Sequence, residues 1–183
     1  MRYVITLIMI GILAAGCSIR SKSYYLLDGN KEVQQSSQKL RGSIGIETMT
    51  LPRYFNQSSV AIKEGENRVI FLPRANWVSN MDEHLTDVLI GYLKRYFNTT
   101  DIYLFPWDVS QKVEKKVAIK IENFIYTKGK IFLNASWEIS QNGTKSAKFF
   151  QLALPSKSDS DSIVKQMDKA FSKLEEAIAK SLS

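Results

Sequence analysis

The sequence predicts an α+β domain over residues 41–183, with a single antiparallel β-sheet and two long amphipathic helices packed on one face. Apolar and polar residues alternate in short runs between residues 42 and 154, as in half-buried strands. Two longer segments, 81–97 and 163–182, place their apolar residues at helical spacing instead. The chain has 183 residues, which suits one domain preceded by a short leader and tether.

The composition excludes several kinds of site. With one Cys and one His, the chain cannot form an intramolecular disulfide, a multi-cysteine zinc site or an H-E-x-x-H metalloprotease site. Hydrophobic residues make up 44% and charged residues 23% of the chain, which is ordinary for a folded domain. Few common catalytic centres can therefore be built from this sequence.

The N-terminus has the pattern of a secretory signal peptide. Arg2 supplies a positive start, and the apolar run from Val4 to Ala15 is shorter than the ~20 residues that cross a bilayer as a helix. Small residues then lead to Cys17. We expect residues 1–16 to be removed.

The residues around Cys17 resemble the lipobox of bacterial lipoproteins, although Ala14 stands where Leu is commonest. The resemblance implies a diacylglycerol on the thiol and an acyl chain on the new amine of Cys17, and no other cofactor is expected. Ser18, in place of Asp, implies the periplasmic face of the outer membrane in a host with two membranes. The alternative is an ordinary secreted protein with a free Cys17.

A polar tether is expected to follow the anchor. Residues 17–40 comprise the lipidated Cys and a stretch rich in Ser, Lys and Gln. The patch Tyr24-Tyr25-Leu26-Leu27 is too apolar for a free linker. We expect it to dock on the domain as an edge strand, or on a partner.

The first half of the domain predicts a strand, a hairpin and a helix. Alternation over 43–48 predicts a strand, and the runs 58–63 and 68–72 flank a turn and predict a hairpin. Ser79 or Asn80 can cap the following helix, and Asn98 can end it in a left-handed conformation.

The second half predicts a meander and a closing helix. After a strand at 101–105, alternation over 116–154 is interrupted by turns at 127–130 and 141–144, and the second turn contains Asn-Gly, a strong hairpin signal. This pattern predicts three antiparallel strands with one solvated face. We expect the final helix to pack on the dry face.

An ordered set of short motifs extends through most of the mature chain. They are the lipobox, Tyr24-Tyr25-Leu26-Leu27, Ile44-Gly45-Ile46, Leu51-Pro52-Arg53-Tyr54-Phe55, Trp77, Phe105-Pro106-Trp107, the run 117–124, Trp137 before Asn142-Gly143, and the closing helix. This order resembles the ABC-type transport auxiliary lipoproteins, the PqiC/YmbA-like family. The resemblance implies an outer-membrane lipoprotein facing the periplasm. It also implies a role beside an ABC-type permease and an MCE-domain protein in moving lipids or other solutes between membranes, and possible homo-oligomers.

No catalytic site is predicted. His84 lies at a solvent-leaning position of the first helix, G-x-S-x-G and P-loop motifs are absent from the sequence, and Cys17 is consumed by acylation. We therefore expect a protein that is not an enzyme. Two alternatives stay open: a stand-alone lipid- or ligand-binding lipoprotein, and a cell-envelope hydrolase that the motifs do not support.

Positive charge and aromatic residues suggest contact surfaces. The formal net charge is +7, and six lysines lie around the central strands: Lys112, Lys115, Lys116, Lys120, Lys128 and Lys130. They form either a solvated sheet face or a surface for anionic lipids or an acidic partner, whereas nucleic acid is excluded by export. Tyr24, Tyr25, Tyr54 and Phe55 are the candidate partner or oligomer contacts, although the loop carrying Tyr54 and Phe55 may instead fold back on the core.

Overall fold

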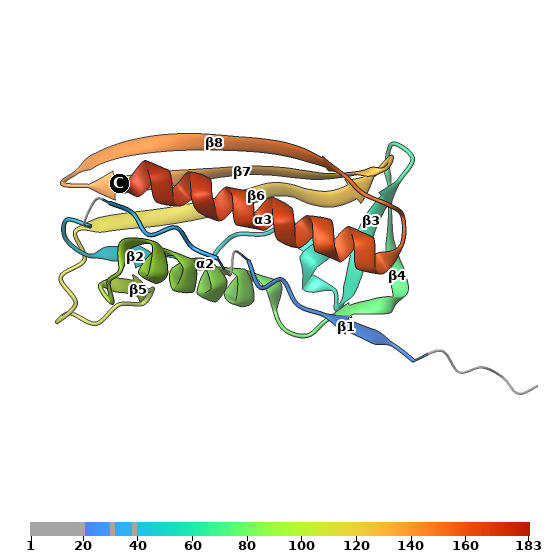
Figure 1. Cartoon of the computed structure of the whole chain (residues 1–183), viewed down its shortest axis with the longest axis horizontal. Helices are drawn as coiled ribbons and strands as arrows, with labels where there is room; N and C mark the ends of the chain where they lie inside the picture. Colours follow the sequence, from blue (N-terminus) through green and yellow to red (C-terminus); the bar gives the residue numbers. More distant parts are fainter. Residues whose placement is uncertain (1–20, 30–31, 38–39) are drawn as a thin grey trace, which may run out of the picture.

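The structure is a computed structural model that describes residues 21–29, 32–37 and 40–183. It contains one eight-stranded sheet, two helices and one 3-10 turn (Figure 1). In chain order the elements are β1 (Ser23–Tyr25), β2 (Ile44–Ile46), η1 (Arg53–Asn56), β3 (Ser59–Glu64), β4 (Arg68–Trp77), α2 (Met81–Phe97), β5 (Ile102–Leu104), β6 (Lys115–Thr127), β7 (Lys130–Gln141), β8 (Thr144–Pro155) and α3 (Ser160–Leu182).

The predicted meander is confirmed. β6, β7 and β8 pair antiparallel along their whole lengths, from Lys115–Gln141 to Thr127–Lys130 and from Gln141–Thr144 to Lys130–Pro155. The turn between β7 and β8 holds Asn142 and Gly143 at φ 50° and 76°, the left-handed conformation that a tight two-residue hairpin requires. The predicted hairpin of β3 and β4 also forms.

The sheet is mixed, so the prediction of an antiparallel sheet is only partly right. β2 pairs parallel with both β5 and β6, β3 pairs parallel with the end of β6, and β1 pairs parallel with β4. The chain leaves β2 and returns to β5 through β3, β4 and α2, and a crossover of this kind brings strands together in the same direction. The alternation of apolar and polar residues specifies which face of a strand is buried. It does not specify which strand lies beside it or in which direction that strand runs.

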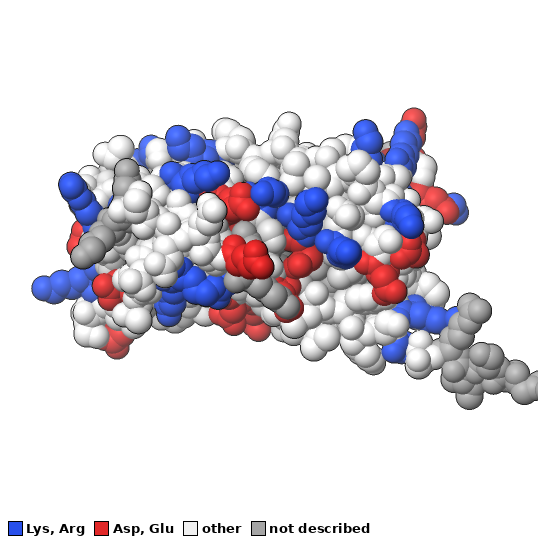
Figure 2. Space-filling model, viewed as in Figure 1, with Lys and Arg blue, Asp and Glu red and all other residues white. Residues whose placement is uncertain are grey.

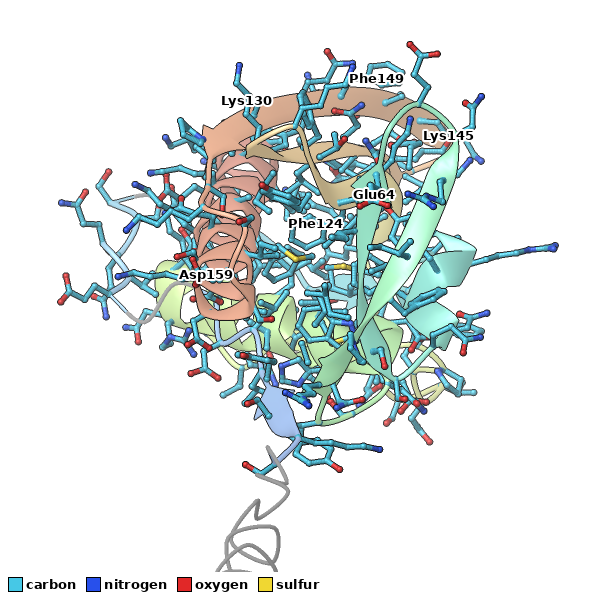
Figure 3. The ribbon with its side chains drawn as sticks, turned by 90° about the vertical axis from the view of Figure 1, so that its right-hand side faces the viewer. Glu64, Phe124, Lys130, Lys145, Phe149 and Asp159 are labelled. Carbon is cyan, nitrogen blue, oxygen red and sulfur yellow. The ribbon has the colours of Figure 1, made fainter. Side chains whose placement is uncertain are left out.

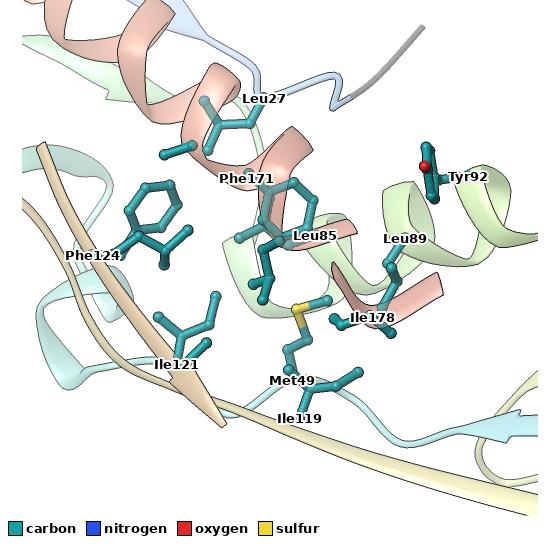
Figure 4. Close-up of a cluster of buried hydrophobic side chains, with 14 of the residues drawn as sticks. Leu27, Met49, Leu85, Leu89, Tyr92, Ile119, Ile121, Phe124, Phe171 and Ile178 are labelled. Carbon is teal, nitrogen blue, oxygen red and sulfur yellow. The ribbon is translucent and has the colours of Figure 1, made fainter. Parts of the chain in front are cut away.

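Both helices lie on one face of the sheet, which we call the inner face (Figure 1). On β6, Val117, Ile119 and Ile121 point inward and are buried, whereas Lys116 and Lys120 point outward and are exposed. Figure 4 shows side chains from β6, α2 and α3 meeting in one core. The fully buried members include Leu27, Met49, Leu85, Leu89, Ile121, Phe124, Phe171 and Ile178.

The helix ends follow local rules. Asn98 adopts φ 49° and ψ 53°, the left-handed C-cap expected from its sequence, and the side chain of Asp159 accepts a hydrogen bond from the backbone N–H of Ser162 at the start of α3. Asn80 precedes α2 but makes no side-chain cap. Thr86, which is fully buried, donates to the Asp82 carbonyl and accepts from the Met49 N–H.

Two glycines predict opposite effects of adding a methyl group. A Cβ at Gly91 in α2 would approach only the flexible end of Arg95, at 3.3 Å, so Gly91→Ala should stabilise the protein by about 0.5–1 kcal/mol. A Cβ at Gly45 would lie 2.7 Å from the Trp107 ring and 2.8 Å from Val113. Gly45→Ala should therefore destabilise the protein, by about 1–3 kcal/mol. Urea unfolding of both variants measures the two changes in stability. Equal changes would contradict the open space at Gly91 and the close contacts at Gly45.

Tyr92 predicts a loss of stability at alkaline pH. Burial raises its pKa to about 12, and the carboxylates of Glu176 and Glu175 add to the rise. The neutral phenol is thus favoured in the folded state, and its stabilising effect is complete below pH ~10 and disappears as pH rises towards about 12. Between pH ~10 and about 12, the free energy of unfolding should fall less steeply for Tyr92→Phe than for the wild type. If it falls equally steeply in both proteins, ionisation of Tyr92 is not a cause of the alkaline loss of stability.

Candidate functional site

The chain between the predicted anchor and the domain forms a strap over residues 23–29. Its first part, β1, is an edge strand that pairs with the end of β4, from Ser23–Ala75 to Tyr25–Trp77, and the Val78 N–H donates to the Tyr25 carbonyl. This confirms the docking of the patch as an edge strand. The range 17–40, predicted as a tether, therefore includes a strand of the sheet.

The second part of the strap lies between the two helices and is held by both. Leu27 is completely buried, and its carbonyl accepts a hydrogen bond from Nε2–H of His84 on α2, at 2.9 Å. The Gly29 N–H donates to Oδ1 of Asp168 on α3, at 2.9 Å. Gly29, with φ +66°, passes so close to α3 that a Cβ would lie 2.7 Å from the carboxylate of Glu175. His84 is thus half-buried, which corrects the expectation of a solvent-leaning side chain.

The two tyrosines of the strap have different surroundings. The Tyr25 hydroxyl donates to Oδ1 of Asp161 in the first turn of α3, at 2.7 Å, and this hydrogen bond raises the pKa of Tyr25. Tyr24 points the other way and is 65% exposed. Only Tyr24 of the pair therefore presents most of its side chain for contact.

The loop with Tyr54 and Phe55 folds back on the core, which is one of the two outcomes that the sequence left open. Phe55 is only 8% exposed and its ring lies 6.1 Å from that of Trp77 and 5.9 Å from that of Phe124. The hydroxyl of Tyr54 accepts from the Phe124 N–H, at 2.9 Å, next to the register shift between Ile121 and Asn123. Burial raises the pKa of Tyr54. Both rings support β6 from within.

A second apolar surface lies in the loop between β5 and β6. Phe105 is 52% exposed and packs edge-on to Trp107, with ring centroids 5.0 Å apart. The Lys116 ammonium lies 5.6 Å from the Trp107 ring centroid, and Val109 is 99% exposed. The sequence signal was weak here, because Trp107 alone suggested core packing. We call residues 104–109 the distal loop.

The lysines around the central strands are spread rather than gathered. Lys116 and Lys120 are exposed on the outer side of β6, whereas Nζ of Lys115 donates to the Leu182 carbonyl at the end of α3. On the other side of the molecule, the helix face, Lys and Arg are interspersed with Asp and Glu (Figure 2). The separate positions of Lys115, Lys116 and Lys120 favour a solvated surface over one gathered basic patch.

The described residues do not present a cluster of metal-ligating side chains. No group of three His, Cys, Asp or Glu side chains comes together within residues 21–29, 32–37 and 40–183. His84 holds the strap, and Cys17 lies outside the described residues. Within the same residues, neither helix is sufficiently long and apolar to span a membrane.

Comparison with known sequences decides the family. A family profile described as the ABC-type transport auxiliary lipoprotein component matches residues 24–179. The chain belongs to this family. The matched range begins within β1 and ends three residues before the end of α3, so it covers nearly all of the described domain. The family resemblance found in the sequence is thereby confirmed, and with it a lipoprotein of the cell envelope that assists ABC-type transport.

Solved structures share the fold. The crystal structure of an uncharacterized protein matches with a TM-score of 0.73 and 17% identity, covering 90% of this chain and 100% of that chain. The crystal structure of protein XCC0632 from Xanthomonas campestris matches with a TM-score of 0.72 and 10% identity, over 86% of this chain and 92% of that chain. No curated protein matches the sequence.

The strap predicts a sharp contrast between two adjacent leucines. Leu27→Ala removes a fully buried side chain and should cost about 2–5 kcal/mol of unfolding free energy. Leu26 is 44% exposed, so Leu26→Ala should cost less than about 1 kcal/mol. Urea unfolding followed by tryptophan fluorescence measures both. Equal, small losses would show that the strap does not dock in solution.

Proposed function

We propose that this protein is the outer-membrane-anchored, periplasm-facing auxiliary lipoprotein of an ABC/MCE-type system that moves lipids or other solutes between membranes. It acts as a non-enzymatic adaptor, and its partners are an MCE-domain protein and an ABC permease. The observation that carries the proposal is the family match over residues 24–179, which begins seven positions after Cys17, the first residue beyond the expected leader.

The proposed anchor is the modified Cys17. Each buried CH₂ of an acyl chain contributes ~0.8 kcal/mol, so a diacylglycerol and an N-acyl chain together hold the protein on the bilayer permanently. Ser18 supports outer-membrane sorting by its resemblance to enterobacterial lipoproteins. The attachment needs no further membrane segment.

The strap supports an adaptor role because it is docked on the fold close in sequence to the proposed anchor. Ser23, the first residue of β1, is six positions after Cys17. The Leu27 carbonyl is bonded to α2 and the Gly29 N–H to α3, so the strap itself is held by both helices. This is the arrangement that a positioning subunit needs.

The packing of the core favours the adaptor role over that of a stand-alone lipid carrier. Side chains of the sheet and of both helices fill the space between them, as Figure 4 shows for the cluster around Leu85 and Phe171. A hollow of about 700 Å³ lies at the surface instead, lined at the end of α2 by Val33, Gln35, Lys94, Arg95 and residues 98–100. Within the described residues, the space between the sheet and the helices is occupied by this cluster of buried side chains.

Anchoring and sorting can be tested with two neighbouring substitutions. Wild-type protein should incorporate labelled palmitate and fractionate with the outer membrane, whereas Cys17→Ser should remain unlabelled. Ser18→Asp should keep the label but move to the inner membrane of an enterobacterial host. An unlabelled wild-type protein would contradict lipidation, and a labelled one in the inner membrane would contradict the outer-membrane assignment.

The partners can be tested in the same cells. Crosslinking followed by purification of the wild-type protein should recover an MCE-domain protein or an ABC permease. The Cys17→Ser protein, which lacks the anchor but keeps the fold, is the matched control and should recover less of both. Recovery of neither partner by the anchored protein would contradict the proposed role.

A further inference from the structure

We infer that the domain itself rests on the bilayer through the outer side of β1 and the end of β4, next to its lipid anchor. This inference rests on the proposed acylation of Cys17. The contact surface, which we call the proximal patch, consists of Tyr24, Leu26 and Val78 with two basic residues, Lys22 and Arg74.

The three apolar members of the proximal patch share one side of a two-stranded ribbon. Tyr25 pairs with Trp77, and both turn inward to the core. Because side chains alternate along extended chain, Tyr24 in β1, Leu26 just after β1 and Val78 just after β4 turn outward. They are 65%, 44% and 60% exposed, which is unusual for adjacent large apolar side chains in a folded domain.

The basic residues fall on the same side. Ser23 pairs with Ala75, and Lys22 and Arg74 each come one residue before this pair. By the same alternation, their side chains turn outward, as those of Tyr24 and Val78 do. Both are exposed. A tyrosine and aliphatic side chains bordered by cations match the boundary between acyl chains and headgroups, where Tyr is enriched and Lys and Arg meet anionic phosphates.

The anchor brings the bilayer to this patch. Ser23 is six positions after Cys17, and a fully extended chain of six steps spans at most about 22 Å. The end of the molecule that carries β1 therefore faces the membrane at short range. Figure 3 looks at this end and shows β1 at its lower edge.

The distal loop lies at the other end of the molecule (Figure 1). β6 runs from the distal loop towards the β1 end, and its 13 residues span about 40 Å. This separation leaves the distal loop in the periplasm while the proximal patch meets lipid. The two ends thus offer a matched pair of exposed valines, Val78 and Val109.

The size of the patch favours lipid over a second copy of the chain. A stable protein–protein interface buries about 800 Å² on each partner, and three partly exposed side chains supply much less apolar surface. Lipid contact needs no such area here, because the acyl chains already hold the protein and the patch only has to set its orientation.

The test uses the full acylated protein in vesicles of phosphatidylethanolamine and phosphatidylglycerol, with a nitroxide on Val78→Cys or on Val109→Cys. Acylated Cys17 does not take the label. At position 78 the ratio of collisions with lipid-soluble oxygen to collisions with an aqueous nickel chelate should be several-fold higher than at position 109. The mass of each protein confirms its acyl chains.

A second arm tests the charges. Removing phosphatidylglycerol, or introducing Lys22→Glu with Arg74→Glu, should reduce lipid contact at position 78 by about five-fold per basic residue, which corresponds to about 1 kcal/mol each. The matched control is Lys112→Glu with Lys120→Glu, away from the patch, and it should have little effect. Equal effects of the two pairs would overturn the role of Lys22 and Arg74.

Three results overturn the inference and can be told apart. In the first, the protein carries its acyl chains, but a nitroxide at position 78 is as accessible to nickel as one at position 109. This result places the proximal patch in water and does not contradict the proposed function. Protection from both oxygen and nickel shows a protein cover, a second copy or a partner. A mass without acyl chains contradicts the proposed function and removes the anchor on which the inference rests.

Discussion

The burial of Leu27 between α2 and α3 is the contact on which the arrangement of this protein depends. Its side chain enters the common core, and hydrogen bonds on either side of it, from His84 to the Leu27 carbonyl and from the Gly29 N–H to Asp168, engage both helices. The strap is thereby held on the domain, and its first residue, Ser23, is six positions after Cys17.

β6 has a similar organising role within the sheet. One edge pairs with β7 along its full length, and the other edge is shared by β2 at its start, Thr50 in the middle and β3 at its end. This divided edge separates the molecule into two ends, with β5 and the distal loop at one and β1 and β4 at the other (Figure 1). An adaptor of the proposed kind needs two such separate ends.

The candidate site was only partly predictable from the sequence. Four aromatic residues were candidates for contact, but Phe55 and Tyr54 support β6 from within, and Tyr25 is bonded to Asp161. Large apolar side chains next to Pro52 gave no sign of whether the loop folds inward. His84 lacked any signal for its bond to Leu27, because that bond joins residues 57 positions apart. Val78 and the distal loop were missed because a single exposed apolar residue has no sequence pattern.

The sequence by itself determined the local structure: the three meander strands, their Asn142-Gly143 turn, the left-handed Asn98 and both amphipathic helices all follow from short-range sterics and the period of the apolar residues. Its ordered motifs also indicated the family. Only the tertiary structure decided that β1 pairs parallel with β4 and that β2 and β3 pair parallel with β6, and which of the aromatic side chains reach the surface. Alternation and helical period repeat within a few residues, whereas strand order and strap docking depend on contacts between distant parts of the chain, which no local pattern encodes.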